Sequence, residues 1–269
     1  MRHGEGSQIE VSDSTEAIMD FLDRKQPELK RFRTKKSILD QRFSVAERAE
    51  HEEELAGARA KRDSNWDIKS SAEGADAEAM FPFIAEDMLT DSDRVYAYVS
   101  QTHPYDDELN ATDAVVAFCS ASDPECRTYR VAVDVTSAQN TDVLHVKEQR
   151  NNERAKRGKF TSLKYGPIPD LANLPLVTIA FTRKHLAEYA VTENVLSGED
   201  ERERRERLHQ LPIRANMLLQ MERQLIEQRE LLARALDAGR INDEDAGKVL
   251  ENIEGTLDAI AKNAPSAEN

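Results

Sequence analysis

The sequence predicts an α/β sandwich core with helical segments on both sides. Two apolar stretches, 112–118 and 129–135, are rich in Val, Ala, Phe and Tyr and enclose a polar turn, which is typical of a β-hairpin. A third apolar stretch, 175–181 (PLVTIAF), has the composition of a strand that helices cover. Charged residues make up 33% of the 269 residues. That content is too polar for one large core, so we expect long exposed helices around a smaller packed unit.

Residues 1–74 are predicted to form a helical extension that ends in a linker. A helix is expected near 13–23, where apolar residues recur behind a suitable cap, and another near 47–61, which is mostly Ala, Glu and Arg and so faces solvent or packs on a partner. The second of them opens with Ser44-Val45-Ala46-Glu47, which is a capping-box pattern. The linker holds Trp66, the chain's only tryptophan, and this large aromatic side chain is expected to anchor the linker on the core.

Residues 75–192 are predicted to form the core itself. A helix over 77–100 is expected to lead into the hairpin, because apolar side chains recur along it at helical spacing. After the hairpin we expect a helix, a short strand, the strong apolar strand and a closing helix, at 142–157, 159–165, 175–181 and 183–191. The element order is therefore α-β-β-α-β-β-α, which is typical of an α/β sandwich.

Residues 193–269 are predicted to form an amphipathic helical hairpin. Leu211, Leu218, Leu225 and Leu232 recur every seven residues, and Asp243 can cap a second amphipathic helix. Two such helices joined by a short connection pack antiparallel. The apolar stripe can pack within the chain, which is the simpler interpretation, or it can bind a second copy of the chain or another protein.

The composition narrows the functional classes. A net charge of −14 argues against a protein coated in nucleic acid. No apolar run approaches the roughly 20 residues of a membrane-spanning helix, and residues 1–16 lack the apolar region of a secretory signal. We therefore expect a cytoplasmic protein that does not enter a membrane. In that setting Cys119 and Cys126 are expected to be reduced structural thiols, with a disulfide as the alternative.

Two acids are expected to meet at the open end of the hairpin. If the strands pair symmetrically about the turn, opposing residues have numbers that sum to about 248, so Asp113 falls opposite Asp134 or Val135. Two carboxylates placed together beside apolar walls repel each other, and such pairs usually hold a metal ion or share a proton. Thr136 projects from the same strand face as Asp134. Oxygen ligands of this kind suit Mg²⁺ or Mn²⁺. Alternatively, each acid merely marks the end of a strand.

The arrangement of Asp113 at the start of one strand and Asp134-Val135-Thr136 at the end of the next resembles the PD-(D/E)xK nuclease superfamily. The resemblance covers about residues 76–182 and rests on the two acids and on the order of elements. It implies a restriction-endonuclease-like core of order α-β-β-α-β. It also implies hydrolysis of nucleic-acid phosphodiesters with Mg²⁺ or Mn²⁺, held by Asp113, Asp134 and the carbonyl of Val135.

The position of the motif lysine in that superfamily is Thr136 in this chain. Members of the superfamily sometimes supply the lysine from another element. Lys147 is the first candidate for this catalytic role, because it lies near the start of the helix that follows the hairpin. Lys159 and Lys164 are the alternatives. If none reaches the acids, the chain is an inactive relative that binds or scaffolds.

Further acids could belong to the same site. In the resembling superfamily the helix before the hairpin often supplies an acid, which makes Glu86 and Asp87 candidates. Asp107 lies in the polar connection just ahead of Asp113 and could enlarge the metal site. A turn explains Asp107 equally well.

A row of basic residues follows the acidic pair. Lys147, Arg150, Arg154 and Arg157 are spaced three, four and three residues apart, which places them on one helix face. This stripe could bind nucleic-acid phosphates next to the acids, or it could be an ordinary solvated face. Three function classes stay open: a metal-dependent nuclease, an inactive nuclease-fold binding protein, and a helical assembly protein.

Overall fold

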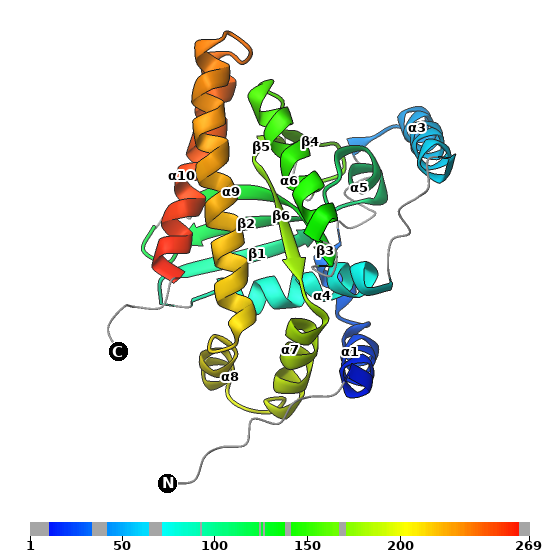
Figure 1. Ribbon diagram of the computed structural model, residues 1–269, viewed down its shortest axis with the longest axis vertical. Coiled ribbons are helices and arrows are strands. Elements are labelled where there is room, and N and C mark those ends of the chain that lie inside the picture. The colour runs from blue at the N-terminus through cyan, green and yellow to red at the C-terminus, as the bar shows by residue number, and fades with distance from the viewer. Residues whose placement is uncertain are drawn as a thin grey trace.

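A four-stranded mixed sheet forms the centre of the computed structural model (Figure 1). The strand order is β1-β2-β3-β6, with bounds Val95–Gln101, Ala114–Ser120, Thr128–Ser137 and Leu176–Phe181. β1, β2 and β3 pair antiparallel, whereas β6 runs parallel to β3. The chain is therefore a mixed α/β protein, as the sequence predicts. The structure describes residues 11–33, 42–64, 72–91, 93–123, 125, 127–137, 141–166 and 171–263.

Helices surround the sheet on several sides (Figure 1). In chain order they are α1 Val11–Lys25, the 3₁₀ helix η1 Leu29–Phe32, α3 Val45–Ser64, α4 Ala72–Leu89, α5 Pro104–Asn110, α6 Thr141–Lys156, α7 Arg183–Val195, α8 Glu201–Leu208, α9 Pro212–Asp237 and α10 Asp243–Asn263. A second, two-stranded sheet joins β4 (Thr161–Leu163) to β5 (Leu171–Leu174). β5 was not expected from the sequence.

The hairpin of β2 and β3 has the predicted register to within one residue. Ala114 opposes Val133, and Cys119 opposes Thr128. One step beyond the Ala114–Val133 pair, Asp113 and Asp134 lie at the same end of the two strands. Asp113 directly precedes β2 and Asp134 lies in β3, so the two acids meet at the open end of the hairpin as predicted, and the metal ion that they would share stays a prediction.

The helix expected over 77–100 is wrong at its C-terminal end, because residues 95–101 form the strand β1. Val95, Ala97 and Val99 are buried, whereas Tyr96 and Tyr98 are exposed. This alternation has the period of two that a strand requires, and it competes with the helical spacing of the apolar residues before it. β1 and α5 are thus inserted between the predicted helix and the hairpin.

The capping box at the start of α3 is confirmed. The backbone N–H of Ser44 donates to Glu47 Oε2 at 2.7 Å, and the N–H of Glu47 donates to Ser44 Oγ at 3.2 Å. The two side chains therefore satisfy two backbone donors at the helix start. The predicted anchor Trp66 lies outside the described residues.

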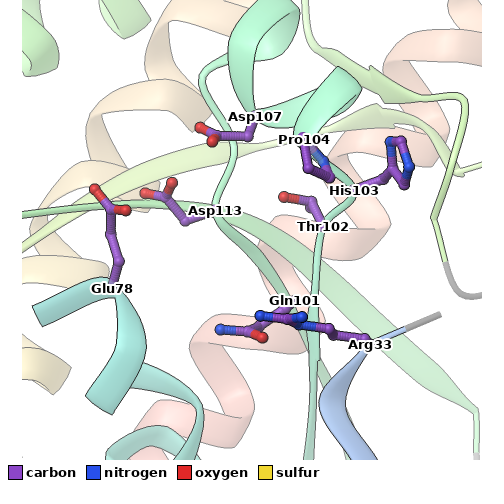
Figure 2. Close-up of a pocket in the computed structure, with 8 residues that line it drawn as sticks. All are labelled: Arg33, Glu78, Gln101, Thr102, His103, Pro104, Asp107 and Asp113. Atoms are coloured by element: carbon purple, nitrogen blue, oxygen red, sulfur yellow. The ribbon is translucent and has the colours of Figure 1, made fainter. Parts of the chain in front are cut away.

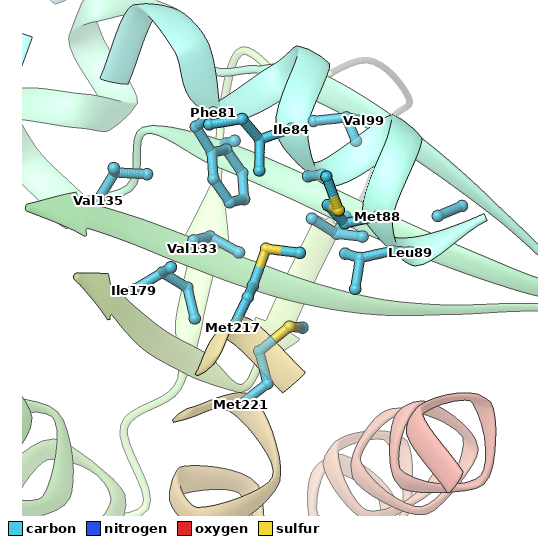
Figure 3. Packing of buried hydrophobic residues seen from close by; sticks show 14 of the residues in the cluster. Phe81, Ile84, Met88, Leu89, Val99, Val133, Val135, Ile179, Met217 and Met221 are labelled. Carbon is cyan, nitrogen blue, oxygen red and sulfur yellow. The ribbon is translucent and has the colours of Figure 1, made fainter. Parts of the chain in front are cut away.

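The core lies between the sheet and the helices α4, α9 and α10. α4 packs on β1 and β3, α10 packs on β3 and β2, and α9 runs along β6. Figure 3 shows Phe81 and Met88 of α4 and Met217 and Met221 of α9 among the buried side chains that surround Val133 of β3 and Ile179 of β6. All of these side chains are buried, so the C-terminal helices contribute to the same core as the sheet.

The outer edge of β6 is closed by a row of glutamines from α9. Three side-chain amides, spaced one turn apart, each accept a hydrogen bond from a backbone N–H of β6 and donate one to the C=O of the same residue. The pairs are Gln220 with Ala180, Gln224 with Thr178 and Gln228 with Leu176. α9 therefore takes the place of a further strand and satisfies backbone groups that a bare edge would expose.

The leucine stripe of the C-terminal helices packs within the chain. Leu218, Leu225 and Leu232 are buried, and Leu211 packs against the main core. α9 ends at Asp237 with Ala238 as its C-cap. The next residue, Gly239, has a φ of +64°, which places it in the left-handed region. The simpler of the two interpretations of the stripe therefore describes the structure. None of the described helices is both long and apolar enough to cross a membrane.

Cys119, near the end of β2, is disulfide-bonded. The expectation of a reduced thiol is wrong for this residue. The chain has one other cysteine, Cys126, which lies outside the described residues. The disulfide, which the sequence left open as the alternative, therefore applies to Cys119.

Candidate active site

Asp113 is fixed in place by the backbone on both sides. α5 ends at Ala111, whose φ of +51° turns the chain toward β2. The N–H of Asp113 donates to Val133 O at 2.8 Å, and its C=O accepts from the N–H of Thr102 at 2.9 Å. Its carboxylate Oδ2 accepts a bond of 2.5 Å from the N–H of Val135. Asp113 is therefore held between β1 and β3.

Asp134 is neutralised by two cations from α6. Its side chain is buried, with 3% of the residue exposed. Oδ1 accepts from Lys147 Nζ at 2.7 Å, and Oδ2 accepts from the guanidinium of Arg150 at 2.9 Å. The Lys147 amine also donates to the carbonyl of Val135 at 3.4 Å. Lys147 and Arg150 are three residues apart and so share the helix face that meets β3.

A cavity of about 380 Å³ opens beside these residues (Figure 2). Glu78 of α4, Asp107 of α5 and Asp113 direct their carboxylates toward one region of it (Figure 2). The described residues that line it are Arg33, Glu78, Gln101, Thr102, His103, Pro104, Asp107 and Asp113. Segments that are far apart in the sequence therefore build one acidic cavity.

The acids of the cavity hold their protons more strongly than free carboxyl groups do. Loss of surrounding water raises the pKa of Glu78 to about 7, with a further contribution from the charges of Asp107 and Asp134. The same loss of water raises the pKa of Asp113 well above its usual value, and the neighbouring acids add to the effect. The pKa of Asp107 is also raised, chiefly by burial. At neutral pH the cluster therefore shares protons or needs a cation.

α5 presents Asp107 because the preceding residue anchors the helix. Asp106 is fully buried. Its carboxylate accepts bonds from the N–H groups of Lys164 and Tyr165, at 2.9 and 2.8 Å, and from the side chain of Asn110. These bonds fix the rotation of α5 about its axis. Asp107, the next residue, consequently faces the cavity.

The rim of the cavity is stiffened by stacked rings. His103 stacks on Tyr165 with ring centroids 4.4 Å apart and 19° between planes. The hydroxyl of Tyr165 lies 2.6 Å from Nδ1 of His51 on α3. Burial lowers the pKa of His103, with a smaller contribution from Arg59. His103 is therefore a neutral wall residue at neutral pH.

Of the three candidate lysines, the structure brings Lys147 to the acids. Lys164 instead donates from its amine to the hydroxyl of Tyr105 at 2.7 Å. Lys159 lines a separate small cavity beside Arg154. Thr136, at the motif position, is buried in β3 opposite Ala180 of β6.

Glu86 and Asp87, the acids expected from the helix before the hairpin, face other partners. Glu86 forms a 2.5 Å ion pair with Arg31. Asp87 accepts from Tyr189 at 2.7 Å and forms an ion pair with Arg204. The acid that α4 gives to the cavity is Glu78, eight residues earlier. Glu78 lies six residues after the first residue of α4, and the sequence pattern did not single it out.

The basic stripe on α6 is largely occupied by the protein itself. Lys147 and Arg150 bind Asp134, and Arg154 donates to the carbonyl of Asn110 at 3.3 Å. Arg157, just past the end of α6, is exposed. The role of these four residues in binding nucleic acid stays a prediction.

The arrangement of the acids in the cavity bears on the predicted metal site. Among the described residues, no group of three or more His, Cys, Asp or Glu side chains has the geometry that holds a metal ion. The chemistry of the donor set does suit a hard divalent cation, because Glu78, Asp107 and Asp113 supply carboxylate oxygens to one cavity. Binding an ion would require these side chains to turn toward one another.

Comparisons with known proteins leave the chain without a family assignment. No protein-family model matches the sequence, and no curated protein or solved structure matches it significantly.

Proposed function

We propose that the chain is a Mg²⁺- or Mn²⁺-dependent nuclease with a restriction-endonuclease-like core. The observation that supports this best is the Lys147 amine on Asp134, next to the Val135 N–H that binds Asp113. An acid pair with a lysine beside it is the arrangement that the resembling superfamily implies, with the lysine supplied by α6. In this proposal α4, β2, β3, α6 and β6 make up the α-β-β-α-β order.

The proposed metal ligands are Asp113, Asp134 and the Val135 carbonyl, with Glu78 and Asp107 completing the set. Raised pKa values support the proposal, because a divalent cation would offset the repulsion that now keeps protons on these acids. A bound ion would supply Lewis-acid polarisation of a phosphoryl oxygen and a more acidic water ligand.

The chain's own residues would position the acids and balance negative charge in the site. Lys147 places one positive charge beside the acids, where charge develops on the phosphate during attack. Arg150 donates to the second oxygen of buried Asp134 and so compensates part of its charge inside the protein. The Val135 N–H fixes the direction of the Asp113 carboxylate. Glu78, whose pKa is about 7, can accept or release a proton near neutral pH.

A second candidate function is an inactive nuclease-fold domain that binds or scaffolds. One observation favours it: both oxygens of Asp134 already accept hydrogen bonds, from Lys147 and Arg150. A carboxylate held in this way is less available to an ion. The third class, a helical assembly protein, loses its main support because the leucine stripe packs inside the chain.

The test is cleavage of labelled single- and double-stranded DNA and RNA with Mg²⁺, Mn²⁺ or EDTA. Wild type should cut with either metal and not with EDTA. Asp113→Asn and Asp134→Asn should each lower the rate about 100-fold or more. Asp237→Asn, an exposed acid on α9, is the matched control and should retain the wild-type rate.

Two results separate the candidate functions. Undiminished cleavage by purified, folded Asp113→Asn and Asp134→Asn would contradict the nuclease proposal. Metal binding by calorimetry without cleavage of any substrate would favour the inactive binding domain.

A further inference from the structure

Arg33 reaches the acidic cavity from the N-terminal segment. The 3₁₀ helix η1 ends at Phe32, which is buried and packs edge-on against Phe83 with ring centroids 5.0 Å apart. The next residue, Arg33, forms a parallel backbone bridge with Gln101 at the end of β1. This anchoring holds the backbone while the exposed side chain extends along the cavity wall, beside Gln101 (Figure 2).

The positive charge of Arg33 is not used by the protein's described residues. Three other cations of this region are paired within the protein: Arg31 with Glu86, and Lys147 and Arg150 with Asp134. No ion pair or side-chain hydrogen bond joins Arg33 to any residue in the described parts of the chain. Among the eight lining residues it is also the one cation, because burial lowers the pKa of His103.

We propose that Arg33 is a substrate-binding residue that holds a phosphate of a nucleic-acid strand across the cavity from Glu78, Asp107 and Asp113. The inference rests on the proposed nuclease function and names a residue outside the resembling core. A phosphodiester carries a negative charge, so three carboxylates repel it. A guanidinium offers several N–H donors in a planar fork that matches phosphate oxygens. The N-terminal segment is thus part of the site.

The test uses two measurements on the full-length protein. The first is Kd for a short fluorescein-labelled DNA strand, by anisotropy, with Ca²⁺ in place of Mg²⁺. The second is KM and kcat for cleavage of the same strand with Mg²⁺. Arg33→Ala should raise Kd and KM about 10- to 100-fold, the usual cost of a lost charged hydrogen bond, and should change kcat less. Arg33→Lys should recover part of the loss, because it restores charge without the fork.

Arg234→Ala is the matched control, because Arg234 is exposed on α9 and does not line the cavity. Its Kd and KM should stay within about twofold of wild type. Circular dichroism of each variant checks folding, which Arg33→Ala should preserve because the bridge to Gln101 is made by backbone.

The outcomes separate this inference from the proposed function. If wild type cuts and Arg33→Ala keeps the wild-type KM and Kd, the Arg33 inference is overturned and the nuclease function stands. If no protein cuts but Arg33→Ala still weakens DNA binding, the function fails and the phosphate role stands. If wild type neither cuts nor binds the strand, both are overturned.

Discussion

Lys147 on α6 donates a hydrogen bond of 2.7 Å to Asp134 on β3, across 13 positions of sequence. A lysine two residues after Asp134 would lie on the same strand, but that position is Thr136. The packing of α6 against β3 therefore brings the cation to the acid pair. A lysine two residues along the same strand would instead reach the pair through the two-residue repeat of the strand.

Replacing Lys147 tests whether this contact is catalytic. Lys147→Met should lower metal-dependent cleavage about 100-fold, the usual effect of removing one donor that stabilises transition-state charge. Lys147→Arg should retain charge with altered geometry and give an intermediate rate. Lys156→Met, on the same helix with an exposed pair to Glu153, should cut like wild type. Equal rates for the Lys147 and Lys156 variants would contradict the assignment.

Metal binding should stabilise the fold in a pH-dependent way. At about pH 8 Glu78, whose pKa is about 7, is ionised and an ion relieves its repulsion with the neighbouring acids, whereas at about pH 5 a proton occupies it. The rise in Tm caused by Mn²⁺ over EDTA should therefore be larger at the higher pH. Thermal unfolding followed by circular dichroism measures this rise. A shift that is the same at both pH values would argue against binding at these carboxylates.

Without metal, the free energy of unfolding should fall as pH rises toward neutrality. The folded pKa of Glu78, about 7, lies above the ordinary 4.5, so the folded state binds more protons than the unfolded chain between these values. Stability from this group is present below pH 4.5 and is lost as pH rises through about 7. Glu78→Gln should flatten this fall in urea titrations across that pH range. The control is Glu222→Gln on the exposed face of α9, which should leave the slope unchanged.

The glutamine row along β6 should contribute strongly to stability. Gln224 accepts from the Thr178 N–H at 2.8 Å and donates to the Thr178 C=O at 2.7 Å. Gln224→Leu keeps the volume but leaves both buried backbone groups unpaired, at a cost of about 2–4 kcal/mol. Urea unfolding measures this loss. Glu227→Leu, at an exposed position on the same helix, should change stability by no more than about 0.5 kcal/mol.

The buried leucine stripe should behave as core and not as a dimer interface. Leu225 is 0% exposed, so Leu225→Asp buries a charge and should prevent folding. Leu219, which is 61% exposed on the same helix, should tolerate Leu219→Asp. Light scattering and circular dichroism report mass and folding together. A folded monomer of Leu225→Asp, formed from a dimeric wild type, would restore the dimer interpretation.

Local patterns in the sequence determined the parts of the fold that depend on near neighbours. Turn composition and strand period placed the hairpin register within one residue, and so brought Asp113 and Asp134 to the same end. The Ser44–Glu47 capping box also depends on residues three apart. The sequence predicted a helix where β1 forms, because helical and alternating apolar patterns overlap between the end of α4 and the start of β1.

The tertiary structure alone decided which distant residues share the cavity. The sequence predicted Glu86 as a candidate acid of the site. In the structure, the rotation of α4 against the sheet turns Glu78 toward the cavity and Glu86 toward Arg31. Arg33 lies at the cavity because Phe32 packs on Phe83 and the backbone of Arg33 then forms a bridge with Gln101. The packing of whole apolar faces sets how each helix is rotated and which remote segments meet. The spacing of the polar residues carries no information about that packing.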